Sequence, residues 1–172
     1  MALESPHLEA LLAAHQHQGQ SNDCGPYTAA IVLRALQGIE VSGTDLAHRM
    51  NHPRRRGALL VVRRVPHWAT FPWGVADILR EHGLPARWHL QASEEDLRRA
   101  LPTREVLLPI LGEWRPRPWA HISALVAWDA ARGWGFVDPA MSRPVLRWRP
   151  AEEFSRQWRA YLRLLVRVRK DE

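Results

Sequence analysis

The sequence predicts a single α+β domain, with helices dominating its first half and β-strands its second half. The chain has 172 residues, a length that suits one domain with a substantial core and is short for two. Hydrophobic residues make up 46% of the chain, which is typical of globular proteins and not of disordered ones. We therefore expect one domain over residues 1–172, with a mainly helical lobe at 1–101 and a mainly β lobe at 102–172.

Apolar residues recur at helical spacing in the first half of the chain. The expected helices cover residues 4–15, 24–36, 44–50, 73–82 and 93–101. The second begins at Cys24, has Pro26 in its first turn and ends before Gly38. It has almost no polar face, so it should be buried centrally. Residues 51–72 are rich in Arg and Pro around an apolar middle, and a short strand or a short helix within a crossing loop fits them equally.

Short apolar runs separated by turn residues replace this pattern after Pro102. The expected strands cover residues 105–111, 121–128, 134–138 and 145–148. Residues 129–133 are typical of a hairpin connection between the second and third of them. An amphipathic helix should follow at 150–160. Leu164, Val166 and Val168 then alternate with arginines, which predicts a half-exposed final strand.

The formal net charge is +6, and Lys170 is the only lysine among 24 basic residues. These residues are spread along the chain, and no nucleic-acid recognition motif accompanies them, so we expect no nucleic-acid partner. A preference for acidic partners or substrates stays open. No apolar run approaches the roughly 18 residues of a membrane span, and the N-terminus lacks the features of a signal peptide. We therefore expect a cytoplasmic protein without a membrane span.

Cys24 is the only cysteine, which excludes an intramolecular disulfide and a zinc site with several cysteines. A single cysteine is more often a small buried hydrophobe than a nucleophile, so its surroundings must decide. Cys24 begins a helix, where unpaired N–H groups and the helix dipole favour a thiolate. Gly25 should leave room for a substrate backbone. The amide of Gln18, on the preceding loop, is placed to join the Cys24 backbone N–H in stabilising an oxyanion.

His121 and Asp138 should emerge at the same end of the hairpin, because His121 begins one strand and Asp138 ends the next. Diagonal neighbours in such a ladder lie about 7–8 Å apart, which permits a hydrogen bond between the two side chains. The carboxylate would orient the imidazole and stabilise its charged form. The imidazole would in turn take the proton from Cys24.

Three segments together resemble one family. The segment from Gln18 to Pro26, QGQSNDCGP, is similar to the Gln-x5-Cys-Gly motif of papain-like cysteine peptidases, and closest to bacteriocin-processing peptidases. The segment around His121, WAHISALVAW, resembles the family's strand with the catalytic histidine. The segment around Asp138, WGFVDP, resembles the strand that ends in the orienting acid. The segment from Trp148 to Trp158 resembles the closing helix. The similarity spans residues 18–168.

The resemblance implies a papain-like fold, with a central helix carrying the cysteine and an antiparallel sheet in the C-terminal half. It implies thiol-dependent hydrolysis of peptide or amide bonds, with Cys24 as nucleophile, His121 as base, Asp138 as orienting acid and Gln18 in the oxyanion hole. The six-residue offset from Cys24 selects Gln18 over Gln16 and Gln20, which share its loop. Relatives of this family cut leader peptides after double glycine and are often fused to ABC transporters.

Other functions stay open at this stage. The same thioester chemistry serves acyl transfer, and a fold of this kind serves as a peptide-binding module without turnover. His15 and His17 form a His-x-His pair, but no further ligands are evident, so we expect no metal and no cofactor. Asn22 and Asp23 fit helix caps better than catalysts. The expected partner is a peptide or protein substrate, with residues 51–72 and 112–119 as candidate walls of its groove.

Overall fold

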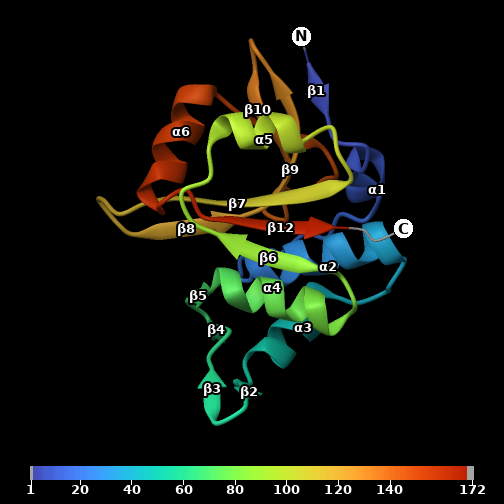
Figure 1. Cartoon of the computed structure of the whole chain (residues 1–172), viewed down its shortest axis with the longest axis vertical. Helices are drawn as coiled ribbons and strands as arrows, with labels where there is room; N and C mark the ends of the chain where they lie inside the picture. The colour runs from blue at the N-terminus through green and yellow to red at the C-terminus, as the bar shows by residue number, and fades with distance from the viewer. Residues whose placement is uncertain (1, 170–172) are drawn as a thin grey trace.

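A central antiparallel sheet separates two groups of helices in the computed structural model, which describes residues 2–169 (Figure 1). The helices are α1 (Leu8–Ala13), α2 (Cys24–Gln37), α3 (Gly43–Met50), α4 (Pro72–Glu81), α5 (Glu94–Ala100) and α6 (Ala151–Ala160). The strands of the main sheet are β1 (Leu3–Glu4), β6 (Ala86–His89), β7 (Glu105–Glu113), β8 (Trp119–Ile122), β9 (Ala124–Asp129), β10 (Gly133–Val137), β11 (Leu146–Arg149) and β12 (Leu165–Arg169). The predicted α+β class with an antiparallel sheet is confirmed.

Strand order in the sheet is β11-β10-β9-β7-β12-β6, with β1 paired to β9 and β8 paired to β7. Strand β7 contributes side chains to two cores, one on each face of the sheet. Val106, Leu108 and Ile110 pack with helices α1 to α4, whereas Leu107 and Leu111 pack with α5 and α6. Because successive side chains of a strand point to opposite faces, burial on both faces explains the unbroken apolar run between Glu105 and Glu113.

Helix α2 is buried along most of its length, as its sequence predicted. It ends at Gly38, whose φ of 69° is the left-handed conformation that glycine adopts without strain. The hydroxyl of Thr28, one turn after Cys24, donates a hydrogen bond to the carbonyl of Ile122 over 3.0 Å. This bond fixes the beginning of the helix against β8.

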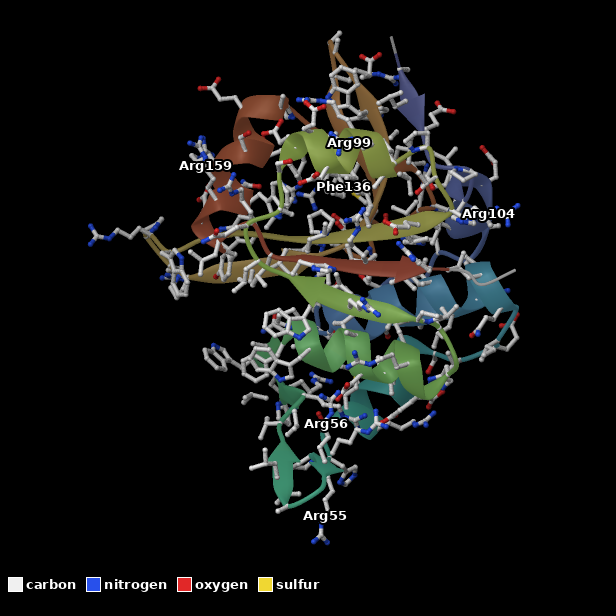
Figure 2. The ribbon with its side chains drawn as sticks, viewed as in Figure 1. Arg55, Arg56, Arg99, Arg104, Phe136 and Arg159 are labelled. Atoms are coloured by element: carbon white, nitrogen blue, oxygen red, sulfur yellow. The ribbon has the colours of Figure 1, made fainter. Side chains whose placement is uncertain are left out.

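Residues 51–72 form two small hairpins, which the sequence had left open. Strand β2 (Arg54–Arg56) pairs with β3 (Leu59–Val61), and β4 (Arg64–Val65) pairs with β5 (Ala69–Thr70). The first hairpin extends away from the sheet and carries Arg55 at its tip (Figure 2). Arg56 lies on the same hairpin, whereas the arginines labelled on α5, on α6 and before β7 lie at separate places, and Phe136 lies in the interior.

Several predicted boundaries were wrong. The expected strand 121–128 is divided at Ser123 into β8, which pairs with β7, and β9, which pairs mainly with β10. The helix expected at 4–15 is limited to α1, because Leu3 and Glu4 pair with β9. Strand β6 was missed because most of its side chains are exposed, leaving no apolar pattern. Within residues 2–169, no helix is long and apolar enough to cross a membrane.

Phe154 should be essential to the core under α6. Its side chain is fully buried and packs against the rings of Trp134, Phe136 and Trp158. Phe154→Ala should lower the free energy of unfolding by about 3–5 kcal/mol, because it leaves a cavity that these rings cannot fill. Urea unfolding followed by circular dichroism measures the change. Trp68→Ala removes an aromatic ring that is mostly exposed and should cost far less; equal costs would contradict this account of the core.

Candidate active site

The His121 ring and the Asp138 carboxylate lie in direct contact. Strand β10 ends at Val137, which pairs with Ala124, so Asp138 emerges beside the Ser123 break and close to β8. The Nε2 atom of His121 lies 2.6 Å from Oδ1 of Asp138. An ionised carboxylate only accepts hydrogen bonds, so the ring donates from Nε2. The other ring nitrogen, Nδ1, is then the one available to the thiol.

Asp138 is fully buried, and the surrounding groups stabilise its charge. Oδ1 also accepts a bond from the backbone N–H of Ala140, and Oδ2 accepts one from Nη1 of Arg147, both over 2.9 Å. Burial alone would raise the pKa of this carboxyl. The hydrogen bond and charge of His121, the Ala140 N–H and the Arg147 guanidinium outweigh burial and lower the pKa to about 2.

Cys24 is the first residue of α2 and is half-buried, and its thiol lies near enough to the His121 ring to raise the pKa of that ring. The imidazole is 13% exposed. Burial works to lower the pKa of His121, but the hydrogen bonds and charges of Asp138 and Cys24 outweigh it and raise the pKa to about 9. The three side chains therefore form a thiol–imidazole–carboxylate row from α2, β8 and the end of β10.

Asn22 and Asp23 do not cap α2 with their side chains, contrary to expectation. Asp23 occupies the position before the helix but makes no side-chain cap bond; its carboxylate pairs with the buried guanidinium of Arg64. The amide of Asn22 donates to the carbonyl of His67 over 3.0 Å. The ion pair offsets a negative charge that would otherwise oppose a thiolate at Cys24.

Gln18 lies on a loop that is attached to the segment following β10. Its backbone N–H donates to the carbonyl of Pro139 over 2.8 Å, and His15 Nε2 lies 3.1 Å from the carbonyl of Asp138. The side-chain amide of Gln18 donates to the carbonyl of Ser21 over 2.7 Å. Because a primary amide carries two donor hydrogens, this bond leaves one for another acceptor.

Gly25 serves a different purpose from the one that the sequence suggested. A Cβ atom at this position would lie 2.6 Å from Cγ2 of Thr70 on β5. The space beside Gly25 is therefore filled by the second hairpin and is not open to a substrate backbone. Packing of β5 against the beginning of α2 places one of the expected groove walls, residues 51–72, directly beside Cys24.

A cavity of about 460 Å³ opens beside the ring of His121. Its lining comes from β8, β11 and α6: Trp119, Ala120, His121, Arg147, Arg149, Glu153 and Gln157. Sequence reasoning did not find Arg147, since nothing in the sequence distinguishes it from the other arginines. Within residues 2–169, no group of three or more His, Cys, Asp or Glu side chains is arranged to hold a metal ion.

Solved structures share this fold at low sequence identity. A protein named as a C39-like peptidase from Bacillus anthracis matches with a TM-score of 0.71 and 13% identity, covering 100% of this chain and 99% of that one. The peptidase domain of Streptococcus ComA, a bifunctional ABC transporter involved in quorum sensing, matches with a TM-score of 0.61 and 16% identity, covering 91% and 97%. No protein-family model and no curated protein matches this sequence. The chain has the fold of C39-like peptidases, so the expected papain-like fold is confirmed.

The pKa of His121 offers a direct measurement of this site. With a pKa of about 9, the imidazole should stay protonated well above the pH of about 6.5 at which an unperturbed histidine loses its proton. Asp138→Asn removes the charge of the carboxylate and weakens its hydrogen bond to the ring, while burial stays, so the pKa of His121 should fall. A ¹H–¹³C NMR titration of the ring measures both values. Asp129→Asn, at the half-buried end of β9 and the far end of the hairpin from His121, is the control and should change nothing; an unshifted pKa in Asp138→Asn would contradict the electrostatic account.

Proposed function

We propose that this protein hydrolyses peptide or amide bonds through a covalent thioester at Cys24. The observation that carries the proposal is the hydrogen bond of the His121 ring to the buried Asp138 carboxylate, with the Cys24 thiol, at the beginning of a buried helix, near enough to raise the pKa of the ring. A thiolate is the nucleophilic form of cysteine, and an adjacent imidazolium stabilises it. The first N–H groups of α2 have no acceptor within the helix and favour negative charge at the same place.

The reaction proceeds in two stages. The Cys24 thiolate attacks the scissile carbonyl carbon, and the backbone N–H of Cys24 and the free amide hydrogen of Gln18 bind the resulting oxyanion. His121 protonates the leaving nitrogen, the carbon–nitrogen bond breaks, and a thioester remains. His121 then takes a proton from water as the water attacks the thioester. The acid product leaves, and the thiolate is regenerated beside the imidazolium.

Asp138 and Arg147 act through His121 and do not touch the reacting atoms. The hydrogen bond from Nε2 to Asp138 keeps the ring in one orientation, with Nδ1 toward the sulfur. Arg147 holds the second carboxylate oxygen, so the carboxylate cannot turn away from the ring. The charge of Asp138 favours the imidazolium, which is the proton donor that the leaving amine requires.

A peptide or protein substrate fits the exposed surface beside Cys24. The hairpins at residues 54–70 present Leu59, Leu60 and Trp68, each at least 70% exposed, and β5 packs directly against Gly25. Exposed apolar side chains of this size are typical of surfaces that bind polypeptide. If an amine replaces water in the second stage, the same site performs acyl transfer, so product analysis with and without added amines separates the two reactions.

Reactivity of the single thiol tests whether His121 activates Cys24. Iodoacetamide should alkylate wild-type Cys24 at pH 6, where an ordinary thiol is almost unreactive. His121→Ala removes the stabilising cation and should reduce the rate at this pH by at least about tenfold. Mass spectrometry over time measures the rate. His48→Ala, on an exposed face of α3, is the matched control; equal rates in all three proteins would overturn the proposal.

Acylation of Cys24 should depend on Gln18, whereas alkylation should not. Displacement of iodide creates no oxyanion, but attack on a p-nitrophenyl ester does. Gln18→Ala should therefore slow acylation by roughly 100-fold and leave the iodoacetamide rate nearly unchanged. Gln20→Ala, on an exposed part of the same loop, is the control and should leave both rates unchanged. A parallel fall of both rates in Gln18→Ala would show that Gln18 only supports the loop.

A further inference from the structure

The cavity beside His121, here called the leaving-side cavity, lies where the departing half of a substrate must pass. In the proposed reaction the His121 ring donates a proton to the leaving nitrogen, so the chain after the scissile bond begins within hydrogen-bond reach of that ring. The ring also forms part of the cavity wall, whereas Cys24 does not. The first residues after the scissile bond are therefore the part of the substrate that can enter this cavity.

Positive charge predominates among the lining residues. Arg147, Arg149 and the protonated His121 line the cavity with one acid, Glu153, whereas Asp138, which binds His121 and Arg147, is fully buried and does not line it. Glu153 is already engaged, because its Oε1 accepts bonds of 3.1 Å from Nη1 of Arg149 and from Nε2 of Gln157. Arg147 and Arg149 lie two residues apart on β11 and line the same cavity, so their like charges repel; burial and the charge of Arg147 accordingly lower the pKa of Arg149. An anion entering the cavity would relieve this repulsion.

Arg147 is the group best placed to meet such an anion. Its side chain is 38% exposed, and its Nη1 binds Asp138. A guanidinium carries five N–H donors in a plane and pairs well with a carboxylate, so Arg147 can hold a second carboxylate while it keeps Asp138 in place. Arg149, by contrast, is almost fully buried and divides its Nη1 between Glu153 and Gln157.

We propose that the leaving-side cavity binds a carboxylate of the substrate segment that is released as the amine, and that Arg147 determines this specificity. The inference rests on the proposed hydrolysis and adds a substrate class: peptides with an acidic group shortly after the scissile bond. That group is either the side chain of Asp or Glu or the terminal α-carboxylate of a short leaving segment. Both present the same chemistry to Arg147.

The preference for a carboxylate after the scissile bond is measured first with a peptide library, so that no substrate sequence has to be assumed. Wild-type protein is incubated with a peptide library made from a digested proteome, and the new amino termini are captured and sequenced. Asp and Glu, or a nearby chain end, should be enriched in the first positions after the cut. If the library stays uncut, the proposed hydrolysis itself fails. If cuts occur without acidic enrichment, the hydrolysis stands and only the present inference is overturned.

Matched peptides then assign the preference to Arg147. The preferred sequence is made with Glu or Gln at the enriched position, and with a free or an amidated C-terminus, which distinguishes the two sources of carboxylate. For wild type, kcat/KM should be roughly tenfold higher for the acid form, because charge-assisted hydrogen bonds are stronger than neutral ones. Arg147→Gln should bring this ratio close to one.

The ratio of kcat/KM for the acid peptide to kcat/KM for the neutral peptide separates two roles of Arg147: binding the substrate carboxylate and positioning Asp138. Losing the hold on Asp138 should lower kcat/KM for acid and neutral peptides by the same factor, whereas losing the carboxylate partner lowers it for acid peptides alone. Arg132→Gln is the control. Arg132 stacks on Trp148 of β11 but does not line the cavity, so the ratio measured for this variant should equal the wild-type ratio. An unchanged ratio in Arg147→Gln would overturn the inference.

Discussion

A carboxylate with no exposed surface, that of Asp138, is the constraint on which the site depends. Burying an unpaired charge costs several kcal/mol, so such a group persists only where donors surround it. His121, Ala140 and Arg147 supply those donors from β8, the loop after β10 and β11. The same bonds that stabilise the charge also fix the orientation of the imidazole. Stability of the fold and geometry of the site are therefore set by one group of contacts.

The elements of the site come from distant parts of the chain, and a few polar bonds hold them in register. The Thr28 hydroxyl joins α2 to β8 one turn beyond Cys24, and the Gln18 backbone N–H joins its loop to Pro139, next to Asp138. The Arg64–Asp23 ion pair attaches the second hairpin to the residue preceding Cys24. Each bond lies within a few residues of a group in the proposed mechanism, so small shifts of these elements relative to one another would be resisted next to the reacting groups.

Much of this arrangement could be predicted because local chemistry marks it in the sequence. An apolar segment after Cys24-Gly-Pro predicts a buried helix, and the turn at 129–133 brings the end of β10, followed by Asp138, back to the beginning of β9, close to His121 on β8. The contact of Thr70 with Gly25 and the bond from Arg147 to Asp138 could not be predicted, since both join segments whose relative placement only the fold determines. Strand β6 was missed for a related reason: as an edge strand with exposed side chains, it is defined by backbone pairing with β12 and not by an apolar pattern.

Charge alternation explains how so many ionised groups can share one buried site. With Cys24 as thiolate, the row reads negative at the sulfur, positive at His121, negative at Asp138 and positive at Arg147. Each charge has an opposite neighbour and the sum is zero, so the row avoids the large penalty of an isolated buried charge. A neutral His121 would leave the thiolate without its partner and Asp138 with Arg147 alone. The raised pKa of His121 and the lowered pKa of Asp138 are thus two consequences of the same alternation. In the proposed mechanism, this alternation keeps the proton donor, His121, charged before the substrate arrives.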